Sequence, residues 1–453
     1  MAKYQKYAEY KDSGVEWLGG IPSHWDCFSG KRIFASVRKA AYETDQQLAA
    51  SQKYGVIPQK LMMELNDSKV MLALKGTDSF RHVDVNNFVI SLRSFEGGIE
   101  YSEYTGCVSP AYTVLQNKKA ISYTYFKYLF KSASYIAALQ STTDSLRDGK
   151  SISYEQFGGI PLPLCNIDEQ QGIATFLDHE TAKIDTLIAK QEKLIELLKE
   201  KRQAVISHAV TKGLNPNVAM KDSGVEWLGD VPEHWRICRL KHVGYIQSGI
   251  AKGKDLTGKT SISVPMLRVA NVQDGYLNLD EVHQIDIEPE QLERYLLQNG
   301  DVLMNEGGDN DKLGRGAVWR NEIKNCIHQN HVFAIRTTVI EPEWLDILTR
   351  ASYAKFHFFR QSKQSTNLAS ISATNIKETP ILVPPNNERE QILGYLNRQF
   401  NQFSKLENRC YQQVELLKER RTALISAAVT GKIDVRHWQN PNKNKEADTE
   451  LSA

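Results

Sequence analysis

The sequence predicts an α+β protein built from two copies of one unit, related by a pseudo-two-fold internal repeat. A fifteen-residue segment occurs at residues 11–25 and again at 221–235, with twelve identical positions. A second repeated segment lies near the end of each unit, at 197–211 and at 416–430. A repeat with preserved ends and divergent centres indicates one scaffold that carries two different central domains.

The two central regions differ in sequence, but each predicts a mixed α+β domain. Short apolar runs at 87–92 and 301–304 are typical of buried strands. Runs at 123–130 and 342–348 are typical of short helices. Glycine-containing turn signals separate these elements. We therefore expect two domains of the same class that differ in surface and in recognition.

Each unit closes with a long proline-free segment, which predicts a helix of about 40 residues and about 60 Å. An alternating four-three apolar frame runs through both segments and is typical of paired helices. The alternative is two amphipathic helices buried separately in globular domains. Asp168 and Asn387 have the capping-box spacing of helix starts. The predicted seam consists of Ile173, Leu177, Ile184, Leu187, Leu198, Val205, Ile392, Leu396, Phe403, Leu406, Leu417 and Leu424.

These patterns divide the chain into five parts. Residues 1–160 form the first mixed domain, 161–213 the first long helix and 214–380 the second mixed domain. Residues 381–438 form the second long helix, and 439–453 are a polar tail that we expect to be disordered.

Composition excludes several classes of protein. The formal net charge of the 453 residues is only +2, so a nucleic-acid partner cannot be inferred from total charge. The six cysteines are scattered without a Cys-x-x-Cys pair, which favours a reducing cytoplasm. We find no signal peptide pattern and no apolar run near the roughly 20 residues of a membrane span.

One segment matches a phosphate-binding pattern. Residues 253–260 fit Gly-x-x-x-x-Gly-Lys-Thr, but the β-branched residues that follow end at Pro265 instead of opening a helix. The interpretation that we favour is a basic loop whose Lys252, Lys254 and Lys259 contact DNA phosphate. The alternative is a P-loop NTPase with a coiled-coil arm.

Other chemistry is sparse. Cys326, His328 and His331 are close in sequence, but three ligands without a second cluster are a weak metal pattern, so we expect no metal site. No motif of a hydrolase, metalloprotease or amino-methyltransferase occurs, so we expect no catalytic residue. The pattern favours a recognition protein. A coiled-coil scaffold that binds only proteins is a further alternative.

Several segments together indicate a family. They are Asp-Ser-Gly-Val-Glu-Trp-Leu-Gly at the start of both units, and the segments 267–272, 300–308, 329–332, 388–392 and 429–435. In these segments the chain resembles the DNA-specificity subunit of type I restriction–modification systems. The resemblance covers essentially the whole chain.

The resemblance implies two target-recognition domains separated by a long antiparallel two-helix coiled coil. Each domain would read half of a split, asymmetric site in double-stranded DNA. Two methyltransferase subunits would dock on the coiled coil, and restriction and translocase subunits would join further out. S-adenosylmethionine, ATP and Mg would belong to those partners, so that this chain holds no cofactor and is not itself an enzyme.

Arginine commonly reads guanine, whereas asparagine and glutamine read adenine. In the first domain the leading DNA-binding candidate is Arg93, beside Gly97 and Gly98. In the second domain the candidates lie mostly in glycine-rich loops. They are Lys252, Lys254, Lys259, Arg268, Asn305, Lys312 and Arg315.

Overall fold

The computed structural model divides the chain into two compact units. Unit 1 combines Met1–Gln191 with Gln412–Ala453, and unit 2 is the continuous segment Glu192–Tyr411. Unit 1 therefore contains both ends of the chain. The structure describes residues 4–66, 79–91, 97–142, 152–251, 256, 258–308, 313–364 and 369–441. Most of the polar tail predicted at 439–453 lies outside the described residues.

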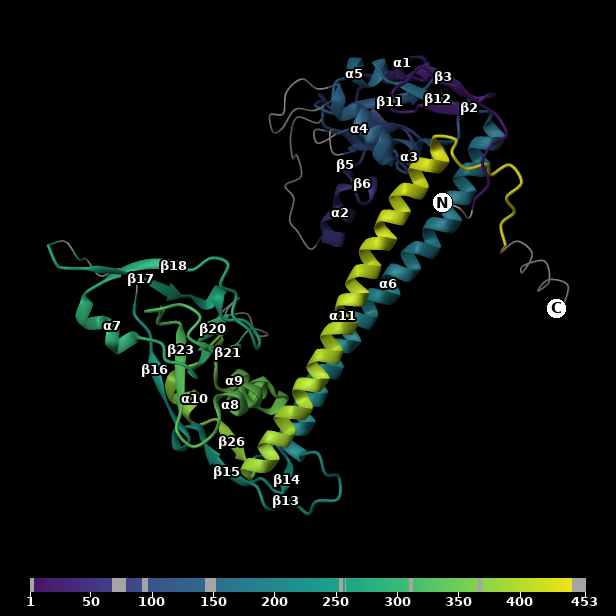
Figure 1. Ribbon diagram of the computed structural model, residues 1–453. Coiled ribbons are helices and arrows are strands. Elements are labelled where there is room, and N and C mark those ends of the chain that lie inside the picture. The colour runs from purple at the N-terminus through teal and green to yellow at the C-terminus, as the bar shows by residue number, and fades with distance from the viewer. Residues whose placement is uncertain are drawn as a thin grey trace. The chain divides into compact units, whose positions relative to one another are not determined.

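Unit 1 contains a four-stranded antiparallel sheet with strand order β4-β11-β8-β9, covered by helices (Figure 1). Its elements are β1 (Tyr10–Asp12), β2 (Gly20–Pro22), β3 (Asp26–Ser29), α1 (Gly30–Ile33), β4 (Phe34–Val37), β5 (Leu48–Ser51), β6 (Gly55–Pro58), α2 (Gln59–Asn66), β7 (Arg81–Val83), β8 (Phe88–Ile90), β9 (Ile99–Tyr101), β10 (Gly106–Val108), β11 (Thr113–Asn117), α3 (Tyr123–Lys131), α4 (Ala133–Ser141), α5 (Tyr154–Gly159), β12 (Pro161–Leu164) and the start of α6 (Ile167–Lys212).

Unit 2 has a sheet with the corresponding order β16-β23-β19-β21. Its elements are β13 (Met220–Asp222), β14 (Asp230–Pro232), β15 (Arg236–Arg239), the 3-10 helix η3 (Leu240–His242), β16 (Gly244–Ser248), β17 (Ile262–Leu267), η4 (Val269–Asn271), β18 (His283–Ile287), α7 (Pro289–Tyr295), β19 (Val302–Asn305), β20 (Gly307–Gly308), β21 (Gly316–Val318), β22 (Ile327–His328), β23 (Val332–Thr337), α8 (Pro342–Arg350), α9 (Ser352–Gln361), β24 (Lys363–Gln364), β25 (Ala369–Ser370), α10 (Ala373–Lys377), β26 (Pro380–Val383) and the start of α11 (Asn386–Val429).

The divergent centres share the topology of their four-stranded sheet and of the helices that follow it, while their smaller sheets differ. The elements α3, α4, α5 and β12 each begin 219 residues before α8, α9, α10 and β26, without an insertion between them. The predicted strands at 87–92 and 301–304 and the predicted helices at 123–130 and 342–348 are confirmed as β8, β19, α3 and α8. The mixed α+β class is therefore confirmed. The whole length difference between the two units therefore falls before these shared elements.

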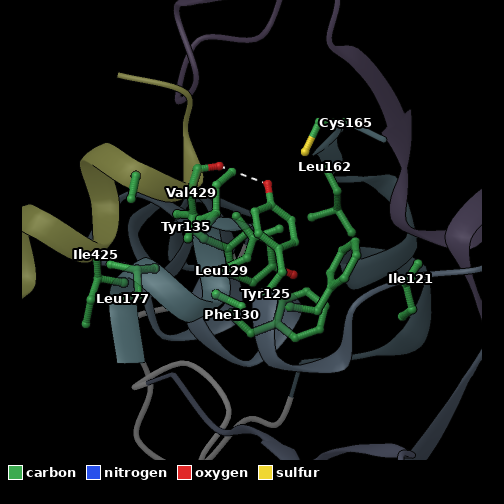
Figure 2. Packing of buried hydrophobic residues seen from close by; sticks show 14 of the residues in the cluster. Ile121, Tyr125, Leu129, Phe130, Tyr135, Leu162, Cys165, Leu177, Ile425 and Val429 are labelled. Carbon is green, nitrogen blue, oxygen red and sulfur yellow. Dashed lines mark hydrogen bonds between the residues drawn. The ribbon is translucent and has the colours of Figure 1, made fainter. Parts of the chain in front are cut away.

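An aromatic cluster fills the core of unit 1 (Figure 2). Tyr125, Phe130 and Tyr135 from α3 and α4 are fully buried or nearly so. The Tyr125 hydroxyl donates to the carbonyl of Val429, at the end of α11, over 3.0 Å. Each large ring removes about 150–250 Å² from water, so this cluster stabilises the attachment of α3 and α4 to the long helices.

Within each unit, the portions of α6 and α11 that belong to it lie side by side and antiparallel (Figure 1). In unit 1, Arg421 Nε donates to Asp185 Oδ1 over 2.9 Å, and Gly172 lies beside Val435. In unit 2, Arg202 donates to Ser404 Oγ over 2.9 Å, whereas Gly213 lies beside Glu388. In these contacts the residue number on α11 falls as the number on α6 rises, as expected for antiparallel helices.

Of the twelve residues in the predicted seam, seven are buried, three are half-buried and two are exposed. Ile173, Leu177 and Ile184 are buried on α6, and Ile392, Leu396, Phe403 and Leu424 are buried on α11, while Leu198, Val205 and Leu417 are half-buried. Leu187 and Leu406 were wrongly placed in the seam, since they are 45% and 44% exposed. In the structure, alternate positions of the contact between the helices are one residue later in the sequence than the four-three frame predicts. Examples are Ile188, Ile195, Val414 and Ala428.

A packing exchange shows how the two units diverge on a common frame. In unit 2 the ring of Phe400 lies beneath the guanidinium groups of Arg202 and Arg350, at 5.7 and 5.3 Å. The corresponding residue in unit 1 is Thr181, whose side chain is smaller than that of phenylalanine. The larger side chain of Tyr128 from α3 packs at this position, with its hydroxyl 3.2 Å from Thr181 Oγ1. Paired changes of this kind conserve volume and are tolerated well by protein cores.

The long helices begin later than the predicted starts at 161 and 381, because strands β12 and β26 occupy those positions, and α11 ends at Val429 instead of 438. Helix α6 starts at Ile167, and the side chain of Asn166 accepts a hydrogen bond from the Glu169 backbone N–H over 2.8 Å. Asp168 and Asn387 are therefore first-turn residues and not N-caps. No helix in the described part of the chain combines the length and apolar character needed to cross a membrane.

Candidate nucleic-acid interface

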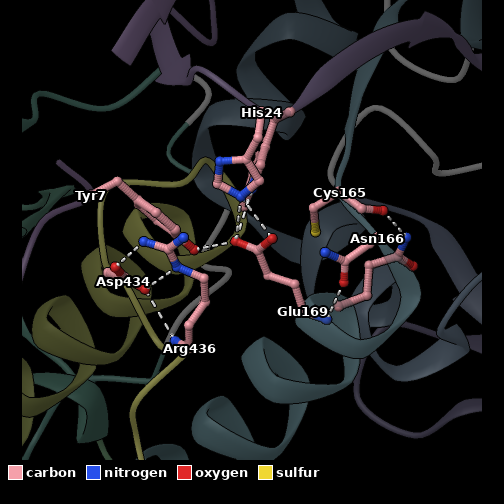
Figure 3. Close-up of polar contacts among 9 residues, drawn as sticks. Tyr7, His24, Cys165, Asn166, Glu169, Asp434 and Arg436 are labelled. Atoms are coloured by element: carbon pink, nitrogen blue, oxygen red, sulfur yellow. Dashed lines mark hydrogen bonds and ion pairs between the residues drawn. The ribbon is translucent and has the colours of Figure 1, made fainter. Parts of the chain in front are cut away.

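A buried carboxylate fastens the repeated segment of unit 1 to the first turn of α6 (Figure 3). Glu169 accepts hydrogen bonds from the Tyr7 hydroxyl at 2.7 Å and from Trp25 Nε1 at 3.0 Å. His24 Nε2 lies 2.9 Å from the second carboxylate oxygen. Burial, and then the hydrogen bond to Glu169, raise the pKa of Tyr7 far above its usual value. Tyr7 therefore remains a donor at all relevant pH values.

The residues after α11 complete this corner of unit 1. Arg436 lies over the Tyr7 ring at 5.0 Å and pairs with Asp434, whose backbone N–H donates to the carbonyl of Gln5. Lys432 donates to the carbonyl of Gly20. The C-terminal segment is thus part of the fold of unit 1.

Unit 2 repeats the same corner. Trp235 Nε1 donates to Glu388 over 3.1 Å, and His234 lies 2.7 Å from the same carboxylate oxygen. Lys212 donates to the carbonyl of Asp230, the counterpart of Gly20. The sequence alone did not predict this contact, although the repeated His-Trp pair and the glutamate at matching positions were a usable signal for it.

Three segments of unit 2 that carry the family resemblance meet at one end of its sheet. The Asn305 amide donates to the carbonyls of Val269 and Val272, at 3.3 and 3.0 Å. The backbone N–H of Glu306 donates to the carbonyl of His331, and that of Asn305 donates to Arg315. Segments 267–272, 300–308 and 329–332 are therefore joined directly.

A fourth segment reaches the same end. The N–H of Ile250 donates to the carbonyl of His328, and the N–H of Asn330 donates back to Ile250. The N–H of Gln329 donates to the carbonyl of Leu267. The loop after β16, which carries Lys252 and Lys254, therefore starts beside the turn between β22 and β23.

The predicted DNA contacts fall on these loops but differ in accessibility. Arg268 and Arg315 are half-buried, and the side chain of Asn305 is enclosed at 2% exposure. Asn305 therefore supports the loops and is not placed to touch a base. Four predicted residues lie outside the described residues: Arg93, Lys252, Lys254 and Lys312. In the sequence, Arg93 comes shortly after β8, which is the counterpart of β19.

The phosphate-binding pattern lacks the surroundings of a P-loop. Lys259 pairs with Glu288, and strand β17 follows the pattern where a P-loop needs the N-terminus of a helix. In the described part of the chain, no helix begins directly after this segment. The structure gives no support to the NTPase alternative.

The Cys-x-His-x-x-His residues have separate roles. Cys326 and His328 are buried, with His328 Nδ1 2.6 Å from the carbonyl of Val332, while His331 pairs with Glu306 at 2.7 Å. Burial lowers the pKa of His328. Among the described residues, no group of three or more His, Cys, Asp and Glu side chains is placed to hold a metal ion.

Comparison with known proteins finds one matching family model. Residues 232–416 match the type I restriction modification DNA specificity domain. The chain is therefore similar to type I DNA-specificity subunits in this segment.

Several curated proteins and solved structures are also similar to this chain. The EcoKI specificity subunit of Escherichia coli (strain K12) is 23% identical over 73% of this chain and 69% of its own length. The MjaVIII specificity subunit of Methanocaldococcus jannaschii is 23% identical over 94% and 98%. A chain solved in work on assembly and conformational transition of the type I R-M system is 14% identical, with a TM-score of 0.68 over 91% of this chain and 99% of that one. That likeness supports the fold.

Proposed function

We propose that this chain is a specificity subunit that binds a bipartite, asymmetric DNA sequence and directs partner methyltransferase and restriction subunits to it. The observation that carries the proposal is the repeat. Two matching scaffolds hold α+β readers whose four-stranded sheets share one topology and whose loops differ. Two readers with different loops would recognise two different half-sites, while a rod of paired helices would set the distance between them.

Exchange of one reader tests this proposal. Residues 26–160 are replaced by the corresponding segment of a relative, and N6-methyladenine is mapped by long-read sequencing in cells that also express the cognate methyltransferase. We expect one half of the methylated sequence to change and the other half to stay. Replacement of 236–380 is the matched experiment and should change the opposite half. A simultaneous change of both halves would contradict separate reading.

We also propose that two methyltransferase subunits dock on the long helices. Each unit exposes a pair of leucines at matching positions: Leu187 and Leu416 in unit 1, and Leu406 and Leu197 in unit 2. Their exposures lie between 44% and 56%. Exposed apolar residues that recur in both units favour two copies of one partner, because equivalent surfaces select equivalent ligands.

Removal of one leucine pair should remove one partner. In the Leu187→Ser, Leu416→Ser double variant, we expect native mass spectrometry to show one bound methyltransferase where the unchanged chain binds two. Ala182→Ser, also exposed on α6, is the control and should keep both. Retention of two partners by the double variant would exclude this surface as the docking site.

The chain itself would do no chemistry. S-adenosylmethionine, ATP and Mg would act in the partner subunits, so that the isolated chain neither methylates nor cleaves DNA. All six cysteines are free, which fits the cytoplasmic location that we propose.

A further inference from the structure

The turn between β22 and β23 in unit 2 is held rigidly by its main chain. Gln329 and Asn330 donate their backbone N–H groups to Leu267 and Ile250, which lie on two other segments. The His328 ring closes the turn on the carbonyl of Val332 at 2.6 Å. Because three segments fix this turn, its side chains are presented with little freedom to move.

The side chains of this turn include two carboxamides, those of Gln329 and Asn330. Among the residues that the structure describes, the side chains of Gln329 and Asn330 form no hydrogen bond, although both are half-exposed. Asn305, one strand away, shows the contrast, since its amide is buried and donates to two carbonyls. A polar side chain with fixed backbone and free donor and acceptor atoms is suited to an external partner.

Resting on the proposed function, we infer that this turn is a base-reading element of unit 2 and that Gln329 and Asn330 select adenine. A carboxamide offers one donor and one acceptor side by side, which match N7 and the N6 amino group of adenine in the major groove. Guanine presents two acceptors at these positions and satisfies only one of the two groups.

The surroundings of the turn support contact with DNA. Arg268 follows Leu267, whose carbonyl accepts from the Gln329 N–H, and its half-buried side chain carries a positive charge that suits a phosphate beside a base contact. His331 Nδ1 lies 2.7 Å from the Glu306 carboxylate, so this carboxylate already has a partner. A cationic side chain and a partnered carboxylate thus neighbour the turn that carries the two carboxamides.

The counterpart turn in unit 1 has different chemistry. Residues 110–112, which precede β11 as 329–331 precede β23, are Pro110, Ala111 and Tyr112. They contain no carboxamide. The two readers therefore differ at equivalent positions of one fold, and unit 1 should not select adenine through this turn.

The test uses the complex of the full chain with its cognate methyltransferase. Binding is measured on duplexes of the methylated sequence in which each adenine in turn is replaced by 7-deazaadenine, which lacks the N7 acceptor. For the unchanged protein, we expect one replacement in the half-site of unit 2 to weaken binding roughly tenfold. The Gln329→Ala or Asn330→Ala variant should already bind the normal duplex that much more weakly and lose little more on the replaced one.

Gln298→Ala is the matched control. Gln298 is an exposed carboxamide in the turn before β19, at the opposite end of that strand from Asn305, and its loss should leave the sequence preference unchanged. The inference is overturned if both turn variants keep the affinity and base preference of the unchanged protein. Failure of the unchanged complex to prefer any sequence would instead overturn the proposed function.

Discussion

Ile184→Asp is expected to lower the free energy of unfolding of unit 1 by about 4 kcal/mol. Ile184 is 4% exposed and packs within the core that joins α6 to α11. A carboxylate at this position would be taken out of water without a cation beside it. Urea denaturation of the full chain, followed by far-UV circular dichroism, measures the change.

Leu187→Asp is the matched control, because Leu187 lies one turn further along α6 and is 45% exposed. We expect this substitution to change the free energy of unfolding by less than about 1 kcal/mol. Equal effects of the two substitutions would mean that the seam assignment from the structure is wrong and that the four-three frame from the sequence was right.

Glu169→Ala is expected to destabilise unit 1 by about 3–5 kcal/mol. Glu169 is 5% exposed, and its removal leaves the Tyr7 hydroxyl and Trp25 Nε1 as buried donors without an acceptor. Thermal unfolding should therefore show an earlier transition, accompanied by a change in tryptophan fluorescence. Asp168→Ala, the exposed neighbour in the same helical turn, should leave the transition almost unmoved. An unchanged transition in Glu169→Ala would show that this carboxylate is dispensable to the corner.

The long helices show which features the apolar periodicity of a sequence can predict and which it cannot. Their existence, length and matched seams followed from proline-free segments and apolar spacing. The predicted seam residues were wrong at alternate positions because two apolar residues are adjacent in the sequence there, as in Leu187-Ile188 and Leu194-Ile195. Either member of such a pair satisfies a four-three frame, and only contact with the other helix selects one.

The candidate site was predictable as a set of loops but not as a set of contacts. The glycine-rich segments around Asn305 and Arg315 do meet in space. The sequence could not tell which of their side chains are accessible to DNA, because burial depends on partners that are distant in sequence. The Asn305 amide donates to the carbonyls of Val269 and Val272, whereas the side chain of Gln329 has no such partner among the described residues. Composition alone makes these amides equivalent.

The division of unit 1 between the two ends of the chain has a consequence for biosynthesis. Unit 2 is continuous, so it can complete its fold once Tyr411 has left the ribosome. Unit 1 must wait for Gln412 onward, although its sheet was synthesised first, and until then the surfaces that receive Val429 and Lys432 stay open to solvent. Closing unit 1 across the intervening segment Glu192–Tyr411 is a modest entropic cost, since that cost grows only with the logarithm of length. The order of maturation is nevertheless reversed relative to the order of translation, so premature termination near the C-terminus would damage unit 1.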